Sequence, residues 1–268
     1  MPRMNYPEPP PLKPKWLAAG GRIRRGGIYW LPNAITTMAL FAGFYAIVQA
    51  MNNRFGLAAV AIFIAMVFDG LDGRVARLTR TQSAFGAEFD SLSDMVSFGA
   101  APGLVIYEWA LKGMGKMGWV AAFVYCACAA LRLARFNTNL AVVDKRYFQG
   151  LPSPAAAGLI AGFVWTMAAF DIEPENIRWA AWALAMFAGL TMVSNVKFYS
   201  GKDINLRKSV PFSVVVAIAM GLVVLVTFQS TLPEMLFILF SVYGISGYII
   251  WLWQLMKGRS GKPPPRAQ

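Results

Sequence analysis

The stretch of sequence that decides the fold spans residues 55–94 and reads FGLAAVAIFIAMVFDGLDGRVARLTRTQSAFGAEFDSLSD. Residues 55–68 carry no charged side chain. After them come four aspartates in two pairs: Asp69 and Asp72, then Asp90 and Asp94. A long apolar run that ends in carboxylates is typical of a helix that crosses a membrane and carries charged groups to its boundary, where such groups usually have a function.

The whole chain shares this apolar character. Of its 268 residues, 57% are hydrophobic and 14% are charged, whereas about 25% of the residues of a soluble domain are charged. A membrane-spanning helix needs about 20 mostly apolar residues. Runs of this kind predict helices at 31–51, 55–78, 84–111, 117–139, 152–171, 176–195, 209–229 and 233–256. We therefore predict an all-α fold, a polytopic integral membrane bundle of about eight transmembrane helices.

The distribution of basic residues predicts the orientation of this bundle. If the amino terminus is cytosolic, nearly all lysines and arginines fall on the cytosolic side, and the other side keeps only Arg54, Lys112, Lys116 and Arg178. This asymmetry predicts that both termini are cytosolic. It also explains the formal net charge of +12 as a topological signal, so we expect no nucleic-acid partner.

The same analysis divides the chain into three parts. Residues 1–30 form a cytosolic tail with prolines and arginines and without the features of a secretory signal. Within this tail, residues 14–30 have a composition compatible with the headgroup layer. Residues 31–256 form the transmembrane domain, in which the last two spans are accessory. Residues 257–268 form a basic cytosolic tail.

The residue types present restrict the chemistry. The chain has no histidine, which excludes a histidine base, nucleophile or metal ligand, and with them phospholipase-D-type chemistry. The two cysteines, Cys126 and Cys128, point to different faces of a helix, so we expect them to pack rather than to form a disulfide. Carboxylates remain as the candidate catalytic groups.

Helical spacing brings the acidic positions together. Residues three and four apart lie on one face of a helix, so Asp69 and Asp72 share a face, as do Asp90 and Asp94 on the next helix. The short connection makes these two helices antiparallel neighbours. Four aspartates would then converge near the cytosolic surface, where their mutual repulsion requires protonation or a cation.

A divalent metal is one explanation of such a cluster. Oxygen ligands without thiolate or imidazole suit Mg²⁺ or Mn²⁺, which commonly serve phosphate substrates. Two other interpretations stay open. Isolated aspartates often cap helices or pair with arginines, here Arg74, Arg77 and Arg80, and an acidic cluster in a membrane can line the pathway of a cation transporter. Four acids at these spacings, with small residues on the same faces, favour the metal site.

The acids belong to a longer pattern, D-x2-D-G-x2-A-R-x8-G-x3-D-x3-D, of which every fixed position is matched. The matching residues are Asp69, Asp72, Gly73, Ala76, Arg77, Gly86, Asp90 and Asp94. This pattern resembles the signature of the CDP-alcohol phosphotransferase family. Three further segments, 31–33 (LPN), 131–137 (LRLARFN) and 150–155 (GLPSPA), are similar to the membrane-embedded phosphatidylserine synthases of that family.

The resemblance implies a site and a mechanism. The implied ligands of Mg²⁺ or Mn²⁺ are Asp69, Asp72, Asp90 and Asp94. They would hold the ions against the pyrophosphate of CDP-diacylglycerol, and Asp94 would also take the proton from the attacking alcohol. The implied nucleotide-binding residues are Gly73, Ala76, Arg77 and Gly86. The resemblance further implies a homodimer among membrane lipids, in a bacterial inner (cytoplasmic) membrane, with its active site facing the cytosol.

The same resemblance favours serine as the acceptor alcohol. The serine carboxylate needs cationic or polar donors, and the candidates near the end of the fourth predicted span are Arg132, Arg135 and Asn137. The two arginines could equally anchor that helix end at the lipid headgroups. Glycerol phosphate, inositol phosphate or choline are the alternative acceptors within the family, and a divalent cation transporter is the alternative outside it.

Overall fold

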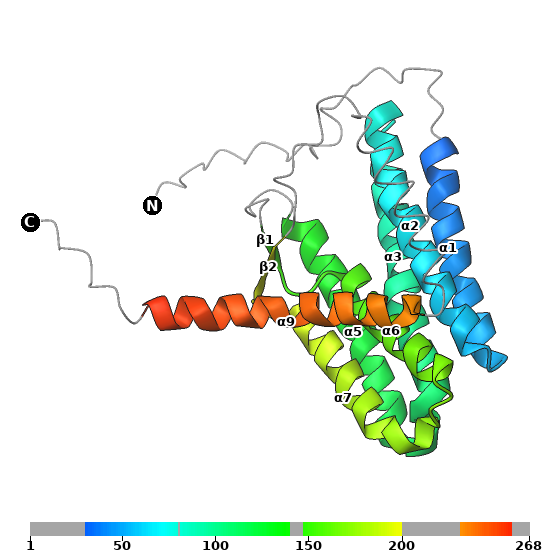
Figure 1. Cartoon of the computed structure of the whole chain (residues 1–268). Helices are drawn as coiled ribbons and strands as arrows, with labels where there is room; N and C mark the ends of the chain where they lie inside the picture. The colour runs from blue at the N-terminus through cyan, green and yellow to red at the C-terminus, as the bar shows by residue number, and fades with distance from the viewer. Residues whose placement is uncertain (1–29, 80, 140–146, 200–230, 259–268) are drawn as a thin grey trace, which may run out of the picture.

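A computed structural model describes residues 30–79, 81–139, 147–199 and 231–258 (Figure 1). These residues are mostly helical. The α-helices are α1 (Trp30–Met51), α2 (Phe55–Thr79), α3 (Ala84–Asp94), α4 (Ala101–Ile106), α5 (Lys116–Asn139), α6 (Ser153–Ala169), α7 (Pro174–Val193) and α9 (Leu232–Gly258). The other elements are two π-helical turns (Met95–Ala100 and Tyr107–Leu111), a 3₁₀ turn (Lys112–Met114) and two short strands, β1 (Tyr147–Gln149) and β2 (Lys197–Tyr199).

Four of the described helices are long and apolar enough to cross a membrane: Trp30–Met51, Phe55–Thr79, Lys116–Thr138 and Leu232–Trp253. Large apolar side chains are exposed on all four, as expected for contact with lipid; examples are Phe41, Val67, Phe123 and Ile249. The prediction of a helical integral membrane protein is therefore confirmed. The predicted span 209–229, residues 1–29 and residues 259–268 lie outside the described part of the chain, so the count of eight and the sides of the termini stay predictions.

The predicted span 84–111 forms one continuous helical path, although it is not a regular α-helix. A π-helical turn, Met95–Ala100, separates α3 from α4, and a second one, Tyr107–Leu111, follows α4. Pro102 lies in the first turn of α4, directly after the first π-helical turn. Because proline has no N–H to donate, it is tolerated at such a helix start, and the wider turn before it absorbs the irregularity.

Helices α1 and α2 are antiparallel neighbours that pack through small residues. Their buried positions are rich in alanine: Ala39, Ala42, Ala46 and Ala50 on α1, and Ala58, Ala59, Ala61 and Ala65 on α2. Small residues let two helix backbones approach closely, which strengthens van der Waals packing inside a membrane. The turn between the helices closes through the Arg54 N–H, which donates to the Gln49 carbonyl at 2.9 Å.

Helix α3 and the π-helical turn after it lie along α1. The Ser97 hydroxyl donates to the Ala39 carbonyl at 3.1 Å. Gly43 makes this approach possible, because a Cβ atom at that position would overlap with Ser97. Helix α1 therefore contacts both α2 and α3, the two helices that carry the aspartates.

The remaining helices form the other side of the molecule. Helix α5 packs against α7, and α6 packs against both α2 and α9. Strands β1 and β2 are antiparallel and join the segment before α6 to the segment after α7. Gly150, which follows β1 with a φ of 77°, donates its N–H to the Val196 carbonyl at 2.8 Å. This strand pair, which the sequence did not predict, fixes the start of α6 beside the end of α7.

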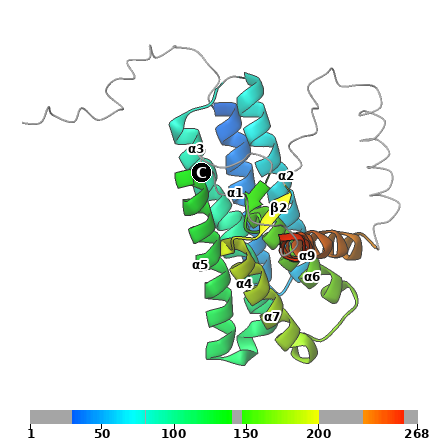
Figure 2. The ribbon, with the colours of Figure 1, turned by 90° about the vertical axis from the view of Figure 1, so that its left-hand side faces the viewer.

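Helix α9 lies against α6 and runs crosswise to α1 and α2 in both views (Figures 1 and 2). A Cβ atom at Gly158 of α6 would lie 2.7 Å from the Phe240 ring, and one at Gly162 would lie 2.9 Å from the Phe237 backbone. The two glycines therefore make the close contact between α6 and α9 possible. The last predicted span, 233–256, exists as a helix and is packed onto the rest of the described chain.

Candidate functional site

Three aspartates meet where α2 and α3, which both pack against α1, carry their acidic residues toward each other. Asp69 and Asp72 of α2 and Asp90 of α3 each offer a carboxylate oxygen, and these three oxygens lie within 4.8 Å of one another. Asp72 is 4% exposed, and the other two side chains are half-buried. The structure thus brings together three of the four aspartates that were expected to converge.

A short, capped connection sets this geometry. The Thr81 N–H donates to the Ala76 carbonyl at 3.0 Å at the end of α2. Ser83 is the N-cap of α3, and its Oγ accepts the Gly86 N–H at 2.9 Å. Because the cap starts α3 immediately after the turn, α3 runs antiparallel to α2 and carries Asp90 back beside Asp72.

The triad has the donor set of a hard divalent cation. Three carboxylates this close repel one another strongly where water is scarce, so either a proton is shared among them or a cation balances their charge. Within residues 30–79, 81–139, 147–199 and 231–258, no lysine or arginine forms an ion pair with them; the ion pair in this part of the chain joins Lys112 to Glu108. Oxygen-only ligands at these separations fit Mg²⁺ or Mn²⁺.

Asp94 lies beside this triad rather than within it. One turn beyond Asp90 on α3, it interacts with Asp69 and with Arg132 of α5. Its carboxylate is not among the three whose oxygens lie within 4.8 Å of one another. Asp94 is therefore near enough to act on a group bound at the triad, and it lies between Asp69 of α2 and Arg132 of α5.

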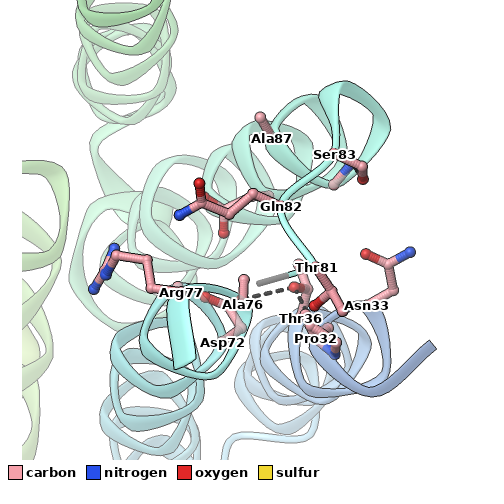
Figure 3. A pocket seen from close by; sticks show the side chains of 13 residues that line it. Pro32, Asn33, Thr36, Asp72, Ala76, Arg77, Thr81, Gln82, Ser83 and Ala87 are labelled. Atoms are coloured by element: carbon pink, nitrogen blue, oxygen red, sulfur yellow. Dashed lines mark hydrogen bonds between the residues drawn. The ribbon is translucent and has the colours of Figure 1, made fainter. Parts of the chain in front are cut away.

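A cavity of about 290 Å³ adjoins the triad and shares Asp72 and Asp90 with it. It lies between the start of α1, the end of α2 and the start of α3 (Figure 3). All four predicted nucleotide-binding residues line this cavity: Gly73, Ala76, Arg77 and Gly86. In Figure 3, Arg77 and Gln82 lie on one side of the hollow and Asn33 on the other.

Two of these residues are glycines, and they leave the cavity open. A Cβ atom at Gly86 would lie 3.1 Å from Ser83 Oγ and 3.4 Å from Asn33 Oδ1, so a side chain there would crowd the rim. A Cβ atom at Gly73 would lie 3.5 Å from an Arg77 nitrogen. Larger side chains at either position would fill space between the arginine, the amide and the acids.

Several residues of the cavity wall lie outside the sequence signature. They are Pro32, Asn33, Thr36, Thr81, Gln82, Ser83 and Ala87. The sequence analysis did not single out Thr36 as a site residue. Its position, one helical turn after Pro32 and within an apolar segment, is the sequence feature that could have indicated it. Its hydroxyl lies 2.7 Å from Asp72 Oδ2.

The three candidate acceptor-binding residues on α5 diverge. Arg132 interacts with Asp94 and Asp69, and its Nη1 donates to Ser153 Oγ of α6 at 2.6 Å. Arg135 points to the end of α7, where it donates to the Val193 carbonyl at 3.2 Å and to Asn195 Oδ1 at 2.6 Å. Of the two arginines, only Arg132 reaches the aspartates in the described structure.

Asn137 and Tyr243 complete the surroundings of this region. Asn137 Nδ2 donates to Ser91 Oγ at 3.0 Å, which ties the end of α5 to the residue after Asp90. Tyr243 of α9 interacts electrostatically with Arg132, and its ring contacts that of Phe198 with centroids 5.7 Å apart. The last span was expected to be accessory, yet it carries a residue next to Arg132.

Comparison with known proteins gives this site a family. The sequence profile of the CDP-alcohol phosphatidyltransferase family matches residues 29–194. A Helicobacter pylori protein named CDP-diacylglycerol–serine O-phosphatidyltransferase is 34% identical over 230 residues, which cover 86% of this chain and 94% of that protein. A Methanocaldococcus jannaschii protein of the same name is 34% identical over 224 residues, covering 83% and 96%. One from Saccharomyces cerevisiae is 39% identical over 147 residues, covering 49% and 52%. The chain belongs to the CDP-alcohol phosphatidyltransferase family, and it is an integral membrane phosphatidyltransferase.

Proposed function

We propose that this enzyme transfers the phosphatidyl group of CDP-diacylglycerol to the hydroxyl of L-serine, with release of CMP. The observation that carries the proposal is a triad of carboxylates that adjoins a cavity of about 290 Å³ between helices α1, α2 and α3. The choice of serine rests on the relatives that carry this activity in their names and match the chain over nearly their whole length.

The metal site is proposed to consist of Asp69, Asp72 and Asp90, with Asp94 beside them and with Mg²⁺ or Mn²⁺ as the ion. A bound ion would neutralise the non-bridging oxygens of the pyrophosphate and so stabilise the departing CMP. The carboxylates hold their places because α2 and α3 both pack against α1 and the start of α3 is capped.

The cytidine end of the donor is proposed to enter the cavity beside the triad. Gly73, Ala76 and Gly86 offer a wall without bulky side chains, so that the nucleotide can approach the helix backbones. Arg77 lines the same wall, and its guanidinium can donate two hydrogen bonds to a phosphate. The pyrophosphate would then lie at the end of the cavity formed by Asp72 and Asp90. The diacylglycerol chains remain in the bilayer.

Asp94 is proposed to act as the general base. Its carboxylate would accept the proton of the serine hydroxyl, and the freed oxygen would attack the phosphorus atom that carries the diacylglycerol. The bond from that phosphorus to the bridging oxygen then breaks, and CMP leaves with the electron pair. Asp94 suits this role because it lies beside the triad, next to Asp69.

Arg132 is proposed to bind the serine carboxylate. It lies near Asp94, so one residue would hold the acid end of serine while the other deprotonates its hydroxyl. Arg135 was predicted for the same task, but its hydrogen bonds to the end of α7 favour a role in anchoring α5. Asn137 would act through Ser91, the neighbour of Asp90.

The orientation that we propose for the enzyme is supported by the charge asymmetry of its sequence, and the choice of membrane by its resemblance to the family. We propose that residues 31–256 form one transmembrane domain, that the tails 1–30 and 257–268 are cytosolic, and that the site faces the cytosol of a bacterium from the inner membrane. We also propose a homodimer. Expression of carboxy-terminal reporter fusions tests the orientation: a fusion at the end of the chain should be active only with a cytosolic reporter.

An assay of CMP release tests the activity. Purified enzyme would receive CDP-diacylglycerol and, separately, serine, glycerol 3-phosphate, inositol 1-phosphate or choline, each with Mg²⁺ or Mn²⁺ and each with a chelator. We expect CMP release with serine only, and none with the chelator. Asp90→Asn should be inactive, and its matched control Asp171→Asn, at an exposed position after α6, should keep full activity. CMP release that is undiminished by the chelator, or that requires another alcohol, would contradict the proposal.

A further inference from the structure

The hydroxyl of Thr36 lies at the edge of the acid cluster, although Thr36 belongs to α1 and not to the acidic helices. Thr36 is 4% exposed, and its Oγ1 lies 2.7 Å from Asp72 Oδ2 (Figure 3). We propose that Thr36 is a positioning residue of the metal site, which holds the Asp72 carboxylate in the orientation that meets Asp69 and Asp90. The inference rests on the proposed function, because it takes the three carboxylates to bind a divalent ion.

The direction of the hydrogen bond follows from the distances. The Thr36 hydroxyl has one hydrogen and two acceptors within reach: the Pro32 carbonyl at 3.1 Å and Asp72 Oδ2 at 2.7 Å. A threonine in a helix usually donates to the carbonyl four residues earlier. Here, however, the carboxylate oxygen is the nearer of the two acceptors, and a hydrogen bond to an ionised group is about twice as strong as a neutral one. The hydrogen is therefore directed to the carboxylate.

This bond restricts how Asp72 can turn. A free carboxylate rotates about its terminal bond, and each rotation presents different lone pairs to an ion. A donor fixed on Oδ2 restricts that rotation, together with the hydrogen bonds that the Asp72 carboxyl makes with the Gly73 backbone and with Asp90. Hydrogen bonds of this kind to a metal-binding group raise metal affinity, and their loss typically costs about 10- to 100-fold.

The backbone carbonyl of Thr36 also accepts a hydrogen bond from α3. Ser93 Oγ of α3 donates to the Thr36 carbonyl at 3.3 Å, and Ser93 lies between Asp90 and Asp94 in the sequence. Thr36 therefore contacts both acid-bearing helices, α2 through its hydroxyl and α3 through its carbonyl. A single residue of α1 thus links the two sides of the metal site.

The next residue provides a matched control. The Thr37 hydroxyl donates to the Asn33 carbonyl at 2.7 Å, the ordinary bond within a helix, and Thr37 is exposed. Thr36 and Thr37 are therefore neighbours on the same helix with the same side chain, and they differ in burial and in the contact with Asp72. Replacing either with valine keeps the shape and removes the hydroxyl.

The test measures Mn²⁺ binding to the purified full-length enzyme without donor or acceptor, by the electron paramagnetic resonance signal of free Mn²⁺. We expect Thr36→Val to weaken Mn²⁺ binding by about 10-fold or more. Thr36→Ser, which keeps the hydroxyl, should bind Mn²⁺ much as the parent enzyme does, and Thr37→Val should equal the parent. CMP binding at saturating Mn²⁺ should be preserved in Thr36→Val, because the proposed effect acts through Asp72.

The possible results separate this inference from the proposed function. If Thr36→Val binds Mn²⁺ as tightly as the parent, or if it loses CMP affinity at saturating Mn²⁺ instead, the positioning role is wrong while the metal site stands. Equal losses in Thr36→Val and Thr37→Val overturn it as well. Both proposals are wrong if the parent enzyme does not bind Mn²⁺, or if Asp90→Asn binds Mn²⁺ as tightly as the parent does. Should Thr36→Val not fold, Thr36→Cys, a poor donor of similar size, must show the same loss.

Discussion

Asparagine at position 94 would remove a proton acceptor while keeping the size of the side chain. Asp94 lies outside the triad of Asp69, Asp72 and Asp90, so the substitution should leave the metal ligands and the nucleotide cavity in place. Loss of a general base costs about 10²- to 10⁴-fold in rate. At about 1.36 kcal/mol for each factor of ten, this corresponds to a barrier higher by about 3–5 kcal/mol. We expect kcat of Asp94→Asn to fall by that factor.

The assay compares Asp94→Asn with Asp90→Asn. Turnover is measured as CMP release at saturating CDP-diacylglycerol and serine, and Mn²⁺ affinity is measured separately without substrates. Asp94→Asn should lose turnover and keep Mn²⁺ affinity, whereas Asp90→Asn should lose both. Near-normal turnover in Asp94→Asn would refute the proposal that Asp94 is the general base. A loss of Mn²⁺ affinity as large as that of Asp90→Asn would instead make Asp94 a metal ligand, as the sequence also suggested.

Three further substitutions probe other parts of the molecule. Arg132→Gln should raise the KM for serine by about 10-fold or more, as expected for loss of a charge-assisted bond, and leave the KM for CDP-diacylglycerol unchanged. Arg135→Gln should chiefly lower the melting temperature, because the hydrogen bonds of Arg135 connect α5 to the end of α7. Gly86→Val should abolish CMP binding in a calorimetric titration, because a Cβ atom there already lies 3.1 Å from Ser83 Oγ. Gly162→Leu should separate α6 from α9 and lower the melting temperature, with a loss of about 1–3 kcal/mol from overpacking.

The acidic site could be predicted from sequence because it is local. Asp69 and Asp90 belong to one helix pair with a short connection, so spacing and helix geometry suffice to bring them together. Asp94 shows the limit of that argument. It shares a helix face with Asp90, but four residues advance about 6 Å along the axis, which exceeds the 4.8 Å spread of the triad. The helix face on which an aspartate lies therefore does not decide whether its carboxylate belongs to the triad or lies beside it.

The surroundings of α5 could not be predicted, because they depend on contacts between distant segments. Arg132 and Arg135 are three residues apart and share a face by spacing, yet one meets Ser153 of α6 and the other meets Asn195 after α7. Which helix lies opposite each arginine is decided by packing, and the strand pair of β1 and β2 that places α6 beside the end of α7 has only three residues per strand. Strands this short leave no periodic signal.

The two substrates of the proposed reaction are therefore served by different parts of the chain. The donor side is built from α1, α2 and α3, which are consecutive and braced by hydrogen bonds such as that from Ser93 to Thr36. The proposed acceptor side lies around Arg132, between α5, α6 and α9, whose contacts come from far apart in the sequence. Changes in α9, which packs mainly against α6, can alter what surrounds Arg132 without replacing a residue of the helices that carry the aspartates. Acceptor choice can thus vary while the metal and nucleotide chemistry stays the same, and Tyr243, on the span that was expected to be accessory, lies where such a change would act.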